Sequence, residues 1–164
     1  RRWKDAGLND ETLLLLCAAA ANRGMHTFAE ADAFIGRFID RGVTEQEKVA
    51  ADLALEADAR ELLFAAGLSK RGVTERDKEL VAKYGSALPL EVMLEGASMA
   101  RDKASPLAYL NALLARWAGE GVKTVADARK SAGSMTERTK GQGAQQFANP
   151  SFDEGTMDGL VNKP

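Results

Sequence analysis

Apolar residues recur at the three- and four-residue spacing of amphipathic helices as far as Ser131, and no segment alternates apolar and polar residues as a half-buried strand does. Capping residues, glycines and prolines divide this pattern into about seven segments. With their caps, the expected helices cover approximately residues 9–22, 27–41, 44–67, 74–85, 89–99, 105–120 and 124–131. The pattern therefore predicts an all-α protein, folded as a compact bundle of about seven helices.

Several of these helices begin with a recognisable cap. Thr27 is followed three residues later by Glu30, the spacing of a capping box, in which each side chain bonds a free backbone amide of the first turn. Ser105 directly precedes Pro106, and proline is favoured in the first turn because it has no amide hydrogen to leave unpaired. These starts fix the helix boundaries better than the apolar pattern alone.

The last part of the chain has a different character. Residues 133–164 contain 5 of the 15 glycines and 2 of the 4 prolines, without an amphipathic period. Such a segment buries too little apolar surface to offset the entropy that it loses on folding. We expect a disordered, flexible C-terminal tail, although its scattered apolar residues are suited to docking on a surface. Those residues are Phe147, Phe152, Met157 and Leu160.

A short phrase recurs along the helical part. Residues 41–44 (Arg-Gly-Val-Thr) recur at 71–74 and, more loosely, at 121–124. The first and third copies also agree upstream, where 34–38 aligns with 113–117 at an offset of 79 residues, from Phe38 to Trp117. We interpret the outer copies as a duplication of one helical unit. The middle copy is interpreted as a simple helix stop and restart, with glycine ending one helix and threonine capping the next.

These observations predict three parts. Residues 1–67 form a first helical unit, residues 68–132 a second, related unit, and residues 133–164 the tail. Because the chain starts at Arg1, within a helix-like phrase, we expect it to be a C-terminal piece of a longer protein.

The residue content argues against several kinds of site. One cysteine, Cys17, excludes a disulfide within the chain, and one histidine, His26, makes a closed zinc site improbable. We expect Cys17 to be a small core residue and predict no cofactor and no metal. The longest apolar run, residues 13–21, is about half of what a membrane span needs, so we expect a cytoplasmic protein.

Paired carboxylates are also an unpromising source of catalysis. The pairs Glu45/Glu47 and Asp52/Glu56 fall on helix faces that we expect to be exposed, beside lysines and arginines. General acid–base chemistry needs titratable groups that converge in a pocket. The sequence offers no such group, and we predict that the protein is not an enzyme.

The small net charge of −2 conceals a gradient along the chain. Residues 1–100 contain 13 Lys and Arg against 17 Asp and Glu, whereas residues 101–140 contain 8 against 4. A basic segment that follows an acidic one is a candidate contact with a polyanion.

One helix of the basic segment carries large apolar side chains in a line. Tyr109, Leu113 and Trp117 are spaced i, i+4 and i+8, so they share one face. The line is most simply part of the core, because aromatic side chains bury large areas. An aromatic ring can also be packed on one side and presented to a ligand on the other, and both interpretations stay open here.

The same helix carries a family resemblance. Residues 88–91 (Leu-Pro-Leu-Glu), 109–117 (Tyr-Leu-Asn-Ala-Leu-Leu-Ala-Arg-Trp) and 121–128 (Gly-Val-Lys-Thr-Val-Ala-Asp-Ala) resemble the C-terminal domain of the DnaD family. Its members are helicase-loading primosome proteins of Gram-positive bacteria and their phages. Leu113 replaces the isoleucine of the family's Tyr-x-x-x-Ile-x-x-x-Trp pattern, and residues 146–153 resemble the family's tail phrase.

The resemblance implies a DNA-binding domain that acts in replication initiation and helicase loading. It implies binding of single- and double-stranded DNA through the signature helix and the segment after it, with low sequence specificity. Around that helix, cations would bind phosphates and an exposed aromatic ring would stack on a base. The candidate DNA-binding residues are Tyr109, Leu113, Arg116, Trp117, Lys123, Arg129, Lys130, Arg138 and Lys140.

The resemblance also implies that oligomerisation resides in a preceding N-terminal domain. A second hypothesis is a protein–protein interaction scaffold that docks a replication initiator or helicase loader without binding DNA itself. The acidic first 100 residues favour such a role for the first unit.

Overall fold

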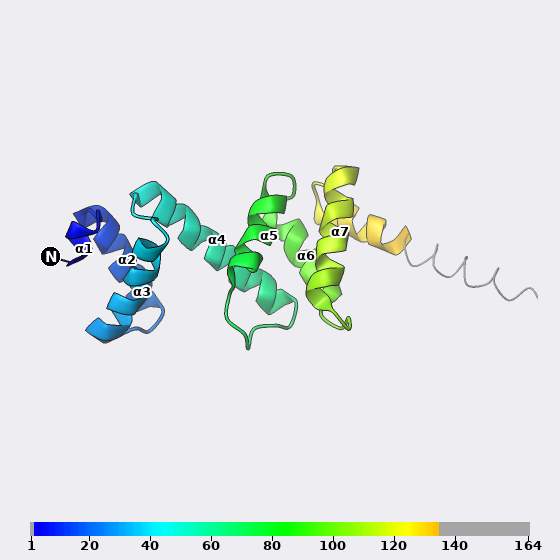
Figure 1. Ribbon diagram of the computed structural model, residues 1–164. Helices are drawn as coiled ribbons and strands as arrows, with labels where there is room; N and C mark the ends of the chain where they lie inside the picture. The colour runs from blue at the N-terminus through cyan, green and yellow to red at the C-terminus, as the bar shows by residue number, and fades with distance from the viewer. Residues whose placement is uncertain (1, 135–164) are drawn as a thin grey trace, which may run out of the picture. The chain divides into compact units, whose positions relative to one another are not determined.

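The computed structural model describes residues 2–134 (Figure 1), and within this range the chain is helical without any strand. The prediction of an all-α protein is therefore confirmed. The helices are α1 (Arg2–Asp5), α2 (Asp10–Asn22), α3 (Phe28–Asp40), α4 (Gln46–Ala65), α5 (Glu75–Gly85), α6 (Leu90–Ala100) and α7 (Pro106–Glu120). Residues 125–134 are helical as well, and the tail expected over 133–164 lies outside the described residues from position 135 onward.

The described residues up to Ala128 form one compact unit, and those from Arg129 onward belong to a second. Within the first unit, the long helix α4 packs on α2 and also on α5 and α6 (Figure 1). The boundary expected between residues 67 and 68 falls in the loop that follows α4. The division into units 1–67 and 68–132 stays a prediction.

Some of the predicted caps are present at the helix starts, whereas Ser105 before α7 makes no side-chain cap hydrogen bond. Asn9 precedes α2 and accepts the backbone N–H of Thr12 through Oδ1 at 2.7 Å. Thr27 and Glu30 form the capping box of α3, in which Glu30 Oε2 accepts the Thr27 backbone N–H at 3.0 Å. By contrast, α4 starts after Glu45 and has no side-chain cap, so the predicted cap at Thr44 is not formed.

The outer copies of the repeated phrase adopt the same conformation. Gly42 and Gly121 both have φ of +69°, in the left-handed region that favours glycine. The next residue in each copy closes a Schellman motif: Val43 N–H bonds the Phe38 carbonyl at 2.9 Å, and Val122 N–H bonds the Trp117 carbonyl at 3.0 Å. The two helix ends are thus equivalent at the predicted offset of 79.

The middle copy is different. Gly72 does not have a positive φ, and the left-handed glycine that ends α4 is Gly67, with φ of +75°. Our interpretation of Gly72 as the stop of a helix is therefore wrong. Thr74 nevertheless caps α5, since its backbone N–H and hydroxyl both bond Asp77 Oδ2 at 2.8 Å.

A side-chain hydrogen bond is also repeated between the two predicted units. In the first, Trp3 Nε1 donates to Asp32 Oδ1 at 2.8 Å, which ties α1 to α3. In the second, the Tyr84 hydroxyl donates to Asn111 Oδ1 at 2.9 Å, which ties α5 to α7. Asp32 and Asn111 are 79 positions apart. The donors Trp3 and Tyr84 are 81 positions apart, so only the acceptors follow the predicted offset, and the duplication stays a prediction.

The core between α6 and α7 closes around a glycine on α6. A Cβ atom added to Gly96 would lie 3.0 Å from Trp117 Cζ3 and 3.2 Å from Leu110 Cδ1. Any larger residue would therefore push α6 and α7 apart.

We expect Gly96→Leu to lower the free energy of unfolding by about 1–3 kcal/mol, as overpacking of a filled core does. Urea denaturation followed by circular dichroism measures this change. Gly36→Leu is the matched control, because a Cβ at Gly36 on α3 meets nothing within 4 Å. Equal losses in the two variants would contradict the close packing described here.

Candidate functional site

The line of large side chains on α7 is largely turned into the core. Trp117 is 0% exposed and Leu113 is 3% exposed. The Trp117 ring lies against Gly96 of α6, and its Nε1 has no hydrogen-bond partner among the described residues. Base stacking by Trp117 and DNA contact by Leu113 are therefore contradicted, because neither side chain reaches the surface. Their interpretation as core residues is confirmed.

Tyr109 is the exception on this line. It lies in the first turns of α7, is only partly buried, and carries the Lys103 ammonium 5.1 Å from the centroid of its ring. A cation over an aromatic face is attracted by the negative charge of that face. Sequence reasoning missed Lys103, although its position six residues before Tyr109, in the loop before α7, was visible.

The predicted cations have separate local environments. Arg116 forms an ion pair with Glu120, Nε to Oε1 at 2.6 Å. Lys123 is exposed and donates to the Ala87 carbonyl at 2.6 Å, in the loop between α5 and α6. Arg129 and Lys130 are exposed and belong to the second compact unit. Arg138 and Lys140 lie outside the described residues.

Tyr109 and Lys123 therefore lie toward opposite ends of α7, a helix whose 15 residues span about 22 Å. Within the compact unit of residues 1–128, the predicted cations are not grouped around the Trp117 ring. What α7 does present is a lysine beside each of its ends, Lys103 and Lys123.

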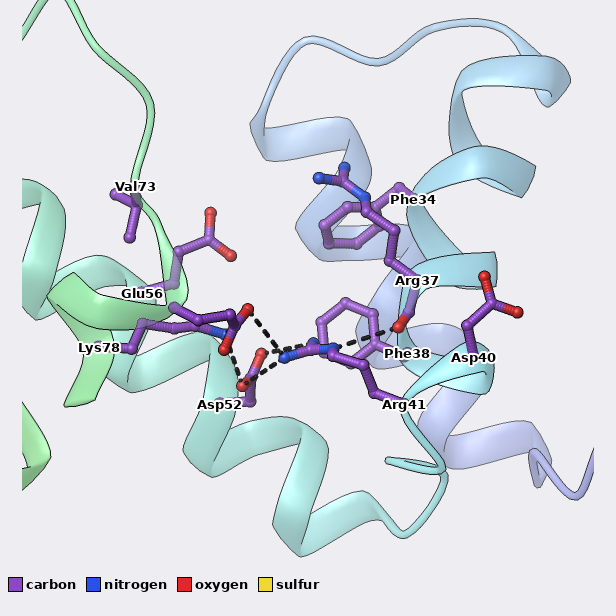
Figure 2. A pocket seen from close by; sticks show the side chains of 10 residues that line it. Phe34, Arg37, Phe38, Asp40, Arg41, Asp52, Glu56, Val73 and Lys78 are labelled. Carbon is purple, nitrogen blue, oxygen red and sulfur yellow. Dashed lines mark hydrogen bonds and ion pairs between the residues drawn. The ribbon is translucent and has the colours of Figure 1, made fainter.

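A cleft lined by charged residues, which the sequence did not reveal, lies between α3, α4 and the start of α5 (Figure 2). We call it the charged cleft; its volume is about 290 Å³. It is lined by Phe34, Arg37, Phe38, Asp40, Arg41, Asp52, Glu56, Val73, Glu75 and Lys78.

Ion pairs join the three helices across this cleft. Arg41 donates through both terminal nitrogens to the two oxygens of Asp52, at 3.1 and 3.0 Å. Lys78 Nζ lies 2.8 Å from Asp52 Oδ1 and 2.9 Å from Glu75 Oε1. Figure 2 shows Arg41 and Lys78 reaching Asp52 from two sides.

The electrostatics of the cleft favour fully charged groups. Burial by itself raises the pKa of Asp52, but the hydrogen bonds from Arg41 and Lys78 outweigh it and hold that pKa below its ordinary value. The hydrogen bond to Asp52 likewise raises the pKa of Arg41. Asp52 is thus an anion that its neighbours stabilise, and it is poorly suited to accept a proton near neutral pH.

Two carboxylates of the cleft correct a prediction. Asp52 and Glu56 were expected on an exposed face, but their side chains are only 17% and 22% exposed and pair with cations from other helices. Glu56 pairs with Arg23, which follows α2. The sequence offered one sign of these ion pairs, the arginine that opens the repeated phrase. Arg41 forms a two-pronged pair with Asp52, and Arg71 forms one with Asp77.

The described residues contain no group of three or more His, Cys, Asp and Glu side chains placed to hold a metal ion. In the same range, no helix is both long and apolar enough to cross a membrane. The ion pairs of the charged cleft connect the end of α3 with α4 and α5.

Comparison with protein-family models, curated proteins and solved structures finds no match for this chain. The resemblance to the DnaD family thus rests on the residues quoted above.

Proposed function

We propose that this chain is a DNA-binding helical domain of a primosomal replication initiation protein, of low sequence specificity, that acts in helicase loading. The resemblance over residues 88–128 supports the family. Leu113 and Trp117 of the signature are buried, so they stabilise the fold by packing in the core beneath α7. DNA contact then falls to the exposed residues at the ends of this helix.

The observation that carries the proposal is which lysines and arginines form ion pairs with carboxylates and which contact only rings or backbone carbonyls. Among the described residues up to position 78, eight cations form ion pairs with carboxylates: Arg2, Lys4, Arg23, Arg41, Lys48, Arg60, Arg71 and Lys78. After position 78, within the compact unit of residues 1–128, Arg116 also pairs with Glu120, whereas Lys83 and Lys103 lie over aromatic rings and Arg101 and Lys123 donate to backbone carbonyls. In the earlier part, Arg37 likewise lies over the ring of Phe34.

Rings and carbonyls hold a cation in place without cancelling its charge. Positively charged groups that are positioned but not neutralised are what a phosphate backbone requires. Lys103 and Lys123, beside the two ends of α7, would contact phosphates separated by roughly the length of that helix. Single- and double-stranded DNA both present such phosphates.

The experiment is a titration of fluorescent single- and double-stranded oligonucleotides at several salt concentrations. We expect Lys103→Gln and Lys123→Gln each to weaken binding and to reduce the slope of log affinity against log salt by about 0.7–0.9, the loss of one phosphate contact. Lys48→Gln is the matched control, because Lys48 is exposed but paired with Glu45 at 2.6 Å. Unchanged affinity and slope in both test variants would refute the proposal.

The second candidate is a scaffold that binds a replication initiator or a helicase loader. The ion-paired, acidic surface of the first hundred residues favours it. Capture of such a protein by a chain that binds neither oligonucleotide at low salt would support the scaffold over DNA binding.

A further inference from the structure

Three large apolar side chains are mostly exposed in the part of the chain that the structure describes: Leu14 at 71%, Phe28 at 74% and Phe64 at 67%. Cys17, on the same helix as Leu14, is exposed too, so our expectation that Cys17 is a core residue is wrong. The ring of Phe28 is stacked on Trp3, with the ring centroids 5.3 Å apart. Phe64 lies in the last turn of α4 and has no such ring partner among the described residues. It therefore presents an aromatic ring to solvent.

Cations lie beside the Phe64 ring. A hollow of about 420 Å³ lies between the end of α4 and the loop before α5, and Phe64 lines it together with Arg60, Lys70 and Arg71. We call it the Phe64 hollow. Among the described residues, none of those that line it is an aspartate or a glutamate. The lining of the hollow therefore favours a ligand that carries negative charge.

The cations of the Phe64 hollow differ in how far their charge is compensated. Lys70 is exposed and forms no ion pair or hydrogen bond with another described residue. Arg60 pairs with Glu56 Oε1 at 2.8 Å, but Arg23 pairs with the same oxygen at 3.1 Å, so two cations share one carboxylate. Arg71 is neutralised by its two-pronged pair. The hollow thus keeps a net positive charge, most of it at Lys70.

A second hollow also borders the ring. Its volume is about 610 Å³, and it is lined by Ala57, Arg60, Glu61, Phe64, Ala65 and Leu94. Glu61 would repel a phosphate on this side, whereas the alanines and the leucine suit an uncharged group. An anion is therefore favoured near Lys70, and a flat apolar group is favoured against the Phe64 ring.

The end of α4 is itself covered by a cation. The unpaired carbonyls at the end of a helix carry partial negative charge, which would repel a phosphate. Arg101, which follows α6, donates to the carbonyl of Ala65 at 3.2 Å and to that of Phe64 at 3.4 Å. Its guanidinium thus places a positive charge at the helix end, where the repulsion would otherwise arise.

Arg101 also connects this region with the proposed DNA contact of α7. Arg101 and Lys103 lie two positions apart in the loop between α6 and α7, and Lys103 is the lysine over the Tyr109 ring. Two residues span at most about 7 Å of chain. A short single strand that contacts Lys103 can therefore continue past Arg101 to the Phe64 ring.

We propose that Phe64 stacks on an unpaired base of single-stranded DNA and that Lys70 binds a phosphate beside that base. Since α7 is proposed to bind DNA, the Phe64 contact rests on that function and adds to it a contact that only a single strand makes. An aromatic ring stacks on any base, so the contact requires no particular sequence. In a duplex the faces of each base are already stacked on neighbouring bases, and exposing one costs free energy.

Titration of the full chain into a fluorescent oligothymidylate, and into a duplex of the same length, tests the proposal. We expect Phe64→Ala to weaken binding of the single strand by about 5-fold or more, the lower end of what an aromatic stack contributes, and to leave binding of the duplex unchanged. The slope of log affinity against log salt should not change in this variant, because the ring carries no charge and releases no counterion.

Further variants separate stacking from other roles of the ring. Phe64→Trp should keep the single-strand affinity, whereas Phe64→Leu retains the apolar bulk without a flat aromatic face and should bind as weakly as Phe64→Ala. Lys70→Gln should weaken single-strand binding and reduce the salt slope by about 0.7, the loss of one phosphate contact. Phe28→Ala is the matched control, because it removes an equally exposed ring from α3 and should bind like the wild type.

Single-strand affinity that is equal in the wild type and Phe64→Ala would overturn the proposal, as would an equal loss on the duplex or full affinity in Phe64→Leu. If Lys103→Gln and Lys123→Gln weaken binding and Phe64→Ala does not, DNA binding stands and the Phe64 contact alone is overturned. A wild type that binds neither oligonucleotide would overturn both. A Phe64→Ala variant that loses only the binding of a fluorescent peptide of alternating leucine and glutamate would also overturn the proposal, because the ring would then bind protein.

Discussion

Replacing Trp117 with alanine is expected to lower the free energy of unfolding by about 3–5 kcal/mol, the usual cost of removing a fully buried large aromatic side chain. The ring is completely enclosed and contacts Gly96 of the facing helix. Its removal leaves a cavity between α6 and α7 that the glycine cannot fill. This loss is a large part of the total stability of a typical domain.

Urea denaturation measured by circular dichroism determines this loss. Phe64→Ala is the control, because it removes an aromatic side chain that is mostly exposed on α4 and should change stability far less. DNA affinity measured under conditions in which the Trp117→Ala variant stays folded should be nearly unchanged. A loss of affinity without a loss of stability would mean that Trp117 contacts DNA directly.

The second large effect is expected at Asp52. Asp52→Asn removes the negative charge that joins Arg41 of α3 and Lys78 of α5 to α4. Lys78 is nearly buried, so it cannot regain full hydration when its partner is neutral. We expect a loss of about 1.5–3 kcal/mol, in the range of hydrogen bonds between charged groups that are partly shielded from water.

The same carboxylate predicts a dependence on pH. The folded protein holds the pKa of Asp52 and of Asp77 below the ordinary value of 3.8. Their contribution is therefore complete above that value and is lost as the pH falls through the folded-state pKa. Stability should fall on acidification, and less steeply in Asp52→Asn.

Urea denaturation from neutral pH down to the acid range measures both effects. Glu45→Gln is the control, because it removes a carboxylate from an exposed ion pair and should cost less than about 1 kcal/mol. Equal losses in the two variants, or identical pH dependence in Asp52→Asn and the wild type, would contradict this account of the charged cleft.

Local signals in the sequence predicted most of the helix starts and ends. The Thr27 and Glu30 capping box and the Ser105-Pro106 start lie where the pattern predicts them, because caps act through residues only three or four positions apart. The equivalence of Gly42 and Gly121 was also visible, since glycine ends a helix by its own backbone preference. The prediction that Gly72 ends a helix was wrong because the same short phrase also occurs in an ordinary loop.

The candidate site was less accessible to sequence reasoning. The α7 pattern shows that Tyr109, Leu113 and Trp117 share a face, but it does not show which helix covers that face. Trp117 is covered by α6 at Gly96, and a glycine gives no sign in the sequence that an aromatic ring packs on it. Asp52 likewise looked like a solvent-exposed carboxylate, because its cations come from α3 and α5. Cys17 looked like a core residue because both its neighbours are apolar.

The sequence by itself determined that this protein is helical and where most of its helices start and stop, because these properties depend on residues close together in the chain. That one helical unit occurs twice stays a prediction. Only the tertiary structure decided which side of each helix is buried. Burial depends on the helix packed opposite, and that partner comes from a distant part of the chain. For this reason Trp117 is enclosed, Asp52 connects three helices, and Cys17 of α2 is exposed.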